Sequence, residues 1–221
     1  MHVPTTPSIL ITAGPTHEPI DAVRFLGNRS SGRLGAALAR EAARRGWSTT
    51  LLLGPVAEPS TDTAVRVVRF QTCSELQGLL REYAKESDIL IMAAAVADFR
   101  PSVSAPVKAG KLRRTNKPLI LELEPTPDLL AEVAASRRPG QTLVGFALEP
   151  REALFDSARD KLARKGVDLV VANPLETMDS PTIEAVVVDA AGRTIPTPGV
   201  MSKPDFAAWL LDIIAHHHRT A

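Results

Sequence analysis

Two loops hold glycine and polar side chains of types that bind anions. Their candidate ligand-binding residues are Gly14, Asn28, Ser30, Ser31 and Gly32. Hydroxyl groups and glycine at the start of a helix leave backbone N–H groups free for an anion, and glycine lets a ligand approach the backbone closely. The same residues could merely cap and pack a helix, so this motif alone leaves both roles open.

A third candidate site lies where the apolar run at 88–95 ends at Ala95 and a loop with Asp98 begins. The small side chain of Ala95 would let a ligand reach the backbone. Asp98 could accept hydrogen bonds or help to hold Mg²⁺, whereas an aspartate that only shapes a loop is also common.

The basic flap at 100–118 has a one-sided charge. No acidic residue occurs between Phe99 and Leu121, and six basic residues lie in the flap: Arg100, Lys108, Lys111, Arg113, Arg114 and Lys117. Long loops in compact domains are usually functional or mobile. A charge run is usually a solvated surface, but a triphosphate requires cationic donors of this kind.

The C-terminal half adds Lys161 and Lys165, which are four residues apart and therefore lie on one face of a helix. Taken alone, they are typical of an exposed surface that carries ion pairs. Asn173 follows a short apolar run and could bind a ligand or shape a turn.

Apolar strands that alternate with helices must position these residues. Strands are predicted at 8–13, 49–53, 65–70, 88–95, 142–147, 168–171 and 183–189, and helices at 32–45, 74–83, 127–136, 151–165 and 203–215. Ser74 is the expected N-cap of the second helix, Pro127 lies near the start of the third, and Gly46 would end the first. The pattern predicts an α/β, Rossmann-like, doubly wound and mainly parallel sheet. Ligands of such sheets bind at the carboxyl ends of the strands.

Composition limits the class of protein. The 221 residues carry a net charge of +1 and a single cysteine, Cys73. These values predict one domain over 1–221, no general attraction to nucleic acid, and a reducing, cytoplasmic environment. Neither a signal peptide nor an apolar run of membrane-spanning length is found, so no membrane partner is expected. The histidines 216–218 are expected at a solvated helix end.

Three common alternatives lack their signatures. No G-x-G-x-x-G follows the first strand, and Tyr83 has Ser87 rather than lysine four residues later, which disfavours a dinucleotide-dependent oxidoreductase. A P-loop sequence and a Cys/His cluster for zinc are also absent. A Rossmann-type domain that binds a nucleotide without catalysis remains an alternative.

Six segments, in order, resemble the phosphopantothenoylcysteine synthetase family. They are ITAGPTHEPIDAVRFLGNRSSGRLG (11–35), AAAVADFRP (93–101), KLRR (111–114), PTPDLL (125–130), VGFALE (144–149) and KLARKGVDLVVANP (161–174). The resemblance implies a ligase of coenzyme A biosynthesis. It activates the carboxylate of 4′-phosphopantothenate with a nucleoside triphosphate and joins it to L-cysteine. Mg²⁺ and CTP, or alternatively ATP, are the implied cofactor and co-substrate.

The resemblance also assigns roles. Asn28 and Lys111 would be catalytic, and the substrate would contact Ser30, Ser31, Gly32 and Ala95. The nucleotide would contact Gly14, Asp98, Phe146, Lys161, Lys165 and Asn173, with Asp98 as the candidate metal ligand. A homodimer is implied, in which a small sheet extension completes the site of the neighbouring subunit.

The chain departs from the family pattern at three points. Arg113 and Arg114 replace lysines of the flap, and Pro174 stands where aspartate is common. Arginine keeps the charge but has a planar, forked shape. Many relatives carry a flavin-dependent decarboxylase before the ligase; none is expected here, and no flavin is expected.

Overall fold

The computed structural model describes residues 6–57, 63–102 and 110–220. Its centre is an eight-stranded sheet with the order β13-β12-β10-β9-β6-β1-β4-β5. Six strands are parallel: β1 (Ser8–Ala13), β4 (Ser48–Leu53), β5 (Val65–Arg69), β6 (Ile89–Met92), β9 (Thr142–Glu149) and β10 (Leu169–Pro174). Two antiparallel strands, β12 (Val186–Asp189) and β13 (Thr194–Pro196), extend one edge. The predicted doubly wound, mainly parallel sheet is confirmed.

The parallel strands lie in the order 3-2-1-4-5-6 when they are numbered along the chain. The direction of winding therefore reverses between β1 and β6. At such a switch point the loops that follow the two strands part and leave a crevice. The loop after Ala13 and the loop after Met92 border this crevice.

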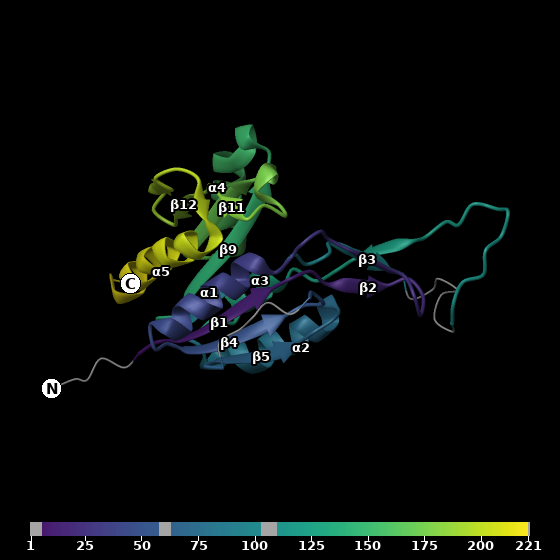
Figure 1. Cartoon of the computed structure of the whole chain (residues 1–221), viewed down its shortest axis with the longest axis horizontal. Coiled ribbons are helices and arrows are strands. Elements are labelled where there is room, and N and C mark those ends of the chain that lie inside the picture. The colour runs from purple at the N-terminus through teal and green to yellow at the C-terminus, as the bar shows by residue number, and fades with distance from the viewer. Residues whose placement is uncertain (1–5, 58–62, 103–109, 221) are drawn as a thin grey trace.

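Helices cover both faces of the sheet (Figure 1). On one face lie α1 (Arg33–Arg44) and α5 (Lys203–Thr220), and on the other lie α2 (Cys73–Tyr83), α3 (Leu129–Ala135) and α4 (Leu154–Lys165). Successive residues of β1 point to opposite faces, so Ile9 and Ile11 pack with α1 while Leu10 packs with α2. Single turns of 3₁₀ helix occur at η1 (Ala84–Glu86), η2 (Arg151–Ala153) and η3 (Leu175–Thr177).

Two helix starts differ from the prediction. The N-cap of α2 is Thr72 rather than Ser74, because the Thr72 hydroxyl accepts a 3.2 Å hydrogen bond from the Glu75 N–H. α3 begins at Leu129 and is capped by Asp128, so Pro127 precedes the helix. The helix ends at Gly46 and Gly166 are as predicted, and both glycines have a positive φ. α5 continues to Thr220 and includes the three histidines.

A narrow extension projects from the body (Figure 1). It contains two antiparallel pairs, β2 (His17–Pro19) with β3 (Phe25–Gly27) and β7 (Phe99–Pro101) with β8 (Leu123–Pro125). The sequence did not predict these strands, because each has three residues and three of them contain proline. A further short pair, β11 (Thr182–Ile183) and β14 (Met201–Ser202), lies next to α5.

Part of the predicted flap, at 103–109, lies outside the described residues. Of the described remainder, 110–118 has no helix or strand, in agreement with a loop, whereas Arg100 and Pro101 belong to β7 and are not loop residues. In the part of the chain that the structure describes, no helix is long and apolar enough to cross a bilayer.

Candidate active site

A cavity of about 640 Å³ opens at the carboxyl ends of β6, β9 and β10, beside the N-terminus of α1. Nine of the residues singled out in the sequence line it: Asn28, Ser30, Ser31, Gly32, Ala95, Asp98, Phe146, Lys161 and Asn173. They come from five separate segments, and the fold brings them to one place. The switch point of the sheet is therefore the candidate active site.

The N-terminus of α1 forms one wall of this cavity. Its N-cap, Gly32, has φ +67°, no side chain caps the helix, and the first turn holds no acidic residue. The first backbone hydrogen bond at this end runs from the Ala36 N–H to the Gly32 carbonyl. The N–H groups of the preceding helical residues are thus available to an anion.

Gly14 lies beneath this wall rather than on it. A Cβ atom on Gly32 would come within 3.4 Å of the Gly14 nitrogen, so the two glycines pack backbone against backbone. A Cβ atom on Gly35 would come within 2.4 Å of the Ala13 Cβ, so α1 also packs directly on β1. Gly14 does not line the cavity and supports the position of α1.

Hydrogen bonds join the loops on either side of the switch point. The Ala95 N–H donates to the Gly14 carbonyl at 2.9 Å, and the Ala97 N–H donates to the Thr16 hydroxyl at 3.0 Å. The Asn28 amide donates to the Val96 carbonyl at 2.9 Å. The loop that carries Asn28 is therefore held against the loop that carries Ala95.

A second cavity of about 590 Å³ shares a wall with the first. Asp98, Phe146 and Lys161 line both cavities, whereas Lys165 lines only the second. The Lys161 ammonium donates to the Phe146 carbonyl, and Lys165 forms an ion pair with Asp128. A ligand as long as a nucleotide could thus occupy both cavities, with the two lysines along its path.

The electrostatic state of Lys161 follows from its position. Burial lowers the pKa of its ammonium group, and the carboxylates of Glu149 and Asp98 partly offset that effect. An incoming phosphate would oppose the effect of burial further, because a nearby anion favours the charged form of lysine. Lys161 is partly buried beside a cavity, so the exposed surface that the spacing of the two lysines suggested by itself does not describe it.

Asn173 lies at the end of β10 and is buried. Its amide donates to the Thr177 hydroxyl at 2.6 Å, and that hydroxyl donates to the Pro174 carbonyl at 2.7 Å. These bonds fix the turn through η3. Asn173 thus shapes the turn and also borders the cavity, so its role in the turn leaves a contact with a ligand open.

Lys111 is the one predicted catalytic residue that the fold does not bring to either cavity. The flap next to it is held by the turn between β2 and β3. The Asp21 carboxylate accepts a 3.0 Å hydrogen bond from the Leu112 N–H and pairs with Arg24 at 2.9 Å. Lys111 is exposed, and its neighbours Gly110 and Leu112 are bonded to this turn of the extension.

The polar residues at the cavity that were not singled out in the sequence include Arg33, Asp179 and Lys203. Asp179 pairs with Arg29 at 2.6 Å and has φ +59°, a strained conformation for a residue other than glycine. Lys203 is buried, with a relative exposure of 8%. Arg33 belongs to a recognised segment, but Asp179 and Lys203 stand in ordinary helix and turn sequence and only their positions reveal them.

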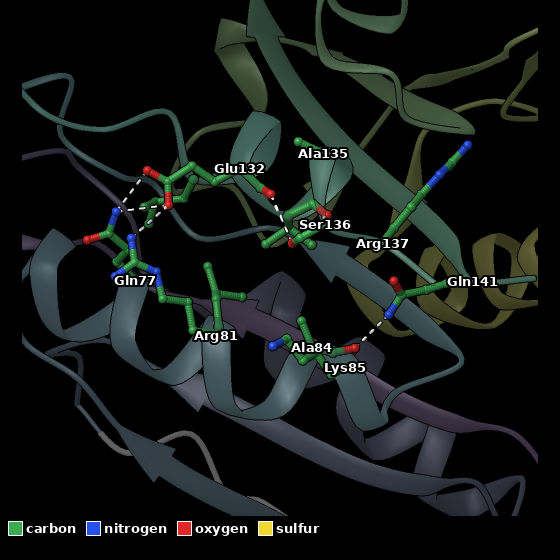
Figure 2. A pocket seen from close by; sticks show the side chains of 12 residues that line it. Gln77, Arg81, Ala84, Lys85, Glu132, Ala135, Ser136, Arg137 and Gln141 are labelled. Atoms are coloured by element: carbon green, nitrogen blue, oxygen red, sulfur yellow. Dashed lines mark hydrogen bonds and ion pairs between the residues drawn. The ribbon is translucent and has the colours of Figure 1, made fainter. Parts of the chain in front are cut away.

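A separate cavity of about 380 Å³ lies between α2 and α3 (Figure 2). Gln141, which precedes β9, closes it by donating to the Ala84 carbonyl at 2.6 Å. It therefore lies at the amino ends of the strands, away from the switch point. Its rim charges are largely paired, as in the 2.9 Å contact between Arg137 and Asp168. None of the predicted site residues lines it.

The chain matches known proteins along nearly all of its length. A family model described as the DNA/pantothenate metabolism flavoprotein C-terminal domain matches residues 5–217. The crystal structure of the C-terminal domain of coenzyme A biosynthesis bifunctional protein CoaBC superposes with a TM-score of 0.82 and 30% sequence identity, and the match covers 97% of each chain.

Longer relatives match over part of their length. The CoaBC protein of Mycobacterium tuberculosis is 45% identical over 173 residues, which are 75% of this chain and 41% of that protein. A prokaryotic protein described as a cysteine/cysteine sulfinic acid decarboxylase is 42% identical over 168 residues, 76% of this chain and 46% of that protein. The chain thus spans less than half the length of these relatives.

Proposed function

The chain belongs to the family of the DNA/pantothenate metabolism flavoprotein C-terminal domain, as its resemblance to phosphopantothenoylcysteine synthetases predicted, and on this premise we propose that it is a phosphopantothenate–cysteine ligase. A nucleoside triphosphate would activate the carboxylate of 4′-phosphopantothenate, and L-cysteine would then be joined to it. The observation that supports this most strongly is the pair of adjoining cavities at the switch point. They bring Asn28, the N-terminus of α1 and Lys161 to a common site.

The first step makes the carboxylate reactive. A carboxylate oxygen attacks the α-phosphorus of the triphosphate, the bond from that phosphorus to the bridging oxygen breaks, and pyrophosphate leaves. The product is an acyl-nucleotidylate. Cations and backbone N–H groups that are already in place stabilise the charge that develops on the phosphates. The N-terminus of α1, Lys161 and Lys165 are suited to this task because each presents a positive charge or a free donor to the cavities.

In the second step the amine of L-cysteine attacks the acyl carbon. The bond to the nucleotide oxygen breaks, the nucleoside monophosphate leaves, and the amine loses its proton to solvent. Asn28 is the proposed residue for the acyl group. Its amide is already oriented by the Val96 carbonyl, so its remaining N–H and its oxygen face the cavity. Ser30, Ser31 and Ala95 flank it on the substrate side.

The residues at the cavity fit a magnesium ion bound through the triphosphate. Mg²⁺ prefers oxygen ligands, keeps several waters, and is usually held by one or two carboxylates together with substrate phosphates. Asp98 is exposed at the wall that the two cavities share, with Glu149 on the same wall. No group of three potential metal ligands occurs among the described residues, so the phosphates would supply the other oxygens. The ion would neutralise phosphate charge.

We propose that the active form is a homodimer, as the family resemblance implies. Four apolar side chains on the extension are strongly exposed: Val23, Phe25, Phe99 and Leu123. Two-stranded pairs are marginal by themselves, and an exposed apolar cluster favours a protein partner. Lys111 lies on this extension and outside its own cavity, so it is proposed to act at the site of the neighbouring subunit.

The choice of nucleotide and of compartment completes the proposal. CTP is favoured over ATP, because the arrangement of Lys161 and Lys165 resembles that of bacterial members. A cytoplasmic location fits a chain whose single cysteine, Cys73, is buried and free. The activity named for the decarboxylase relative is not proposed for this chain, which corresponds to less than half of that protein.

Pyrophosphate release tests the proposal. The purified protein is supplied with 4′-phosphopantothenate, L-cysteine and Mg²⁺, with CTP and ATP in parallel, and the amide product is detected by mass spectrometry. We expect pyrophosphate and amide in equal amounts with CTP, and no release without phosphopantothenate. Folded protein that releases none with either nucleotide would leave a binding domain without this activity.

A further inference from the structure

Lys203 is a buried cation without a partner. It is the first residue of α5, and its relative exposure is 8%. Its ammonium group makes no hydrogen bond or ion pair with any residue that the structure describes. Among the described residues, every fully enclosed side-chain nitrogen and oxygen has a hydrogen-bond partner. The Lys203 ammonium has none, so it is not fully enclosed, and we infer that it opens onto the cavity that its side chain lines.

This position is unfavourable for a lysine in two ways. Removing an ammonium group from water costs several kcal/mol unless an anion replaces the lost hydration. The N-terminus of a helix also carries a partial positive charge, which repels a cation there. Asp179 is the one acidic group near enough to favour the charged form of Lys203, and its carboxylate is already paired with Arg29.

The surroundings of Lys203 add further positive charge. α1 and α5 pack side by side on one face of the sheet (Figure 1), and Arg33 is near enough for its guanidinium to lower the pKa of Lys203 in addition to the effect of burial. The uncapped N–H groups of α1 line the same cavity. The Arg33 side chain also makes no hydrogen bond or ion pair with a described residue. Two unpaired cations and the uncapped N-terminus of α1 therefore meet at one cavity.

We propose that Lys203, with Arg33 and the N-terminus of α1, forms a binding subsite for a phosphate group. The unpartnered, buried ammonium is the observation that distinguishes this subsite from an ordinary helix terminus. The inference rests on the proposed function for its source of phosphate. Two sources share the required chemistry: the pyrophosphate end of the nucleoside triphosphate, and the terminal phosphate of 4′-phosphopantothenate. Lys203 is a binding residue in either case and takes no part in bond making.

Binding without turnover provides the test. Inorganic pyrophosphate, CTP, CMP and 4′-phosphopantothenate are titrated by calorimetry into the wild type, Lys203→Met and Lys203→Arg, and thermal unfolding is recorded without ligand. Lys85→Met is the control, because Lys85 is an exposed lysine at the opposite end of the strands. Methionine keeps the length of the side chain and removes the charge.

We expect Lys203→Met to weaken the affinity for pyrophosphate or for 4′-phosphopantothenate about tenfold or more, the usual effect of losing a charged hydrogen bond. Weaker CTP binding with unchanged CMP binding would place the triphosphate tail in the subsite, whereas an effect on 4′-phosphopantothenate alone would place the substrate phosphate there. Lys203→Arg should recover part of the affinity. The unfolding temperature of Lys203→Met should stay the same or rise, because a buried charge is removed.

Unchanged affinity of Lys203→Met for all four ligands, or a lower unfolding temperature with unchanged affinity, would show a structural lysine and overturn the inference. Failure of the proposed function has a different signature. If the wild type binds pyrophosphate through Lys203 but forms no amide, the subsite stands and the ligase assignment falls. If it forms the amide at the same rate and affinity in Lys203→Met, the ligase stands and the subsite falls.

Discussion

The Asn28 side-chain amide donates a 2.9 Å hydrogen bond to the Val96 carbonyl, across the switch point of the sheet. The two residues are far apart in sequence, and the bond joins the loop before α1 to the loop after β6. It uses one N–H of the amide and leaves the other N–H and the oxygen to the cavity. The residue proposed to handle the acyl group is thus held in place before any substrate binds, which favours catalysis by preorganisation.

The first prediction concerns Asn28→Asp. A carboxylate would lose the donor and place an anionic oxygen against the Val96 carbonyl and near the acyl phosphate. We expect pyrophosphate release to continue while amide formation falls roughly 100-fold, a typical loss when one preorganised donor is removed. The measurement compares pyrophosphate with amide product in a single turnover. Equal amounts of both at the wild-type rate would remove Asn28 from its assigned role.

The second prediction concerns the pH dependence of Lys161. Burial is the main cause that lowers the pKa of this lysine below its usual 10.5. The charged form is disfavoured in the folded protein, which lowers the free energy of unfolding at neutral pH. This loss is relieved as the pH rises from the lowered pKa toward 10.5, where the unfolded chain also loses the proton. Nucleotide affinity should instead fall as the pH rises over this range, because the ammonium group that binds phosphate loses its proton and its charge.

Lys161→Arg separates this effect from other alkaline titrations. Arginine stays charged at every accessible pH, so the alkaline loss of nucleotide affinity should move to higher pH in the variant. Calorimetric dissociation constants between pH 7 and pH 10 provide the measurement. Identical alkaline limbs in the wild type and Lys161→Arg would mean that another group controls the affinity. Because arginine is larger, only the pH at which affinity falls is compared, and absolute affinity is left aside.

The third prediction tests how closely α1 packs on β1. A Cβ atom on Gly35 would lie 2.4 Å from the Ala13 Cβ, so Gly35→Ala must push the helix away from the strand. We expect a loss of about 2 kcal/mol in the free energy of unfolding, as for other overpacked cores. Gly78→Ala is the matched control, because nothing lies within 4 Å of its added Cβ. Gly78 is at an exposed position of α2, so Gly78→Ala should raise the free energy of unfolding by up to about 1 kcal/mol. Urea denaturation of both variants gives the comparison, and two variants of equal stability would contradict the close packing.

The sheet and helices were largely predictable because they depend on local patterns. Short continuous apolar runs such as 8–13 are typical of strands that are buried on both faces, and Gly46 and Gly166 have a positive φ that favours glycine. The sequence analysis placed the N-cap of α2 at Ser74, whereas the cap is Thr72, another hydroxyl residue two positions earlier. The pair Thr72 and Glu75 has the spacing of a capping box and could have identified the cap.

The extension and part of the site were not predictable by the same means. Three-residue strands with Pro19 or Pro125 carry too little pattern to be recognised, and their pairing depends on contacts between distant segments. Resemblance located Lys161, although local sequence favoured a solvated surface. Lys203 escaped both approaches, because a lysine at the start of a helix is unremarkable until its burial is known.

The last prediction concerns the proposed exchange of Lys111 between subunits. Asn28 lines the cavity of its own subunit, whereas Lys111 lies on the extension and lines neither cavity. Asn28→Asp and Lys111→Gln should each lower amide formation by about 100-fold or more, which leaves either variant nearly inactive. In a dimer in which Lys111 serves the neighbouring site, a mixed pair carries both lesions in one site and none in the other. Random exchange of equal amounts of the two inactive variants makes half of the dimers mixed, so about a quarter of the wild-type activity should return. If Lys111 serves its own subunit, every site of a mixed dimer carries one lesion and no activity returns.

Co-expression with two different affinity tags isolates the mixed dimer, and size-exclusion chromatography with light scattering confirms its mass. A monomer of full activity would contradict both the dimer and the exchange.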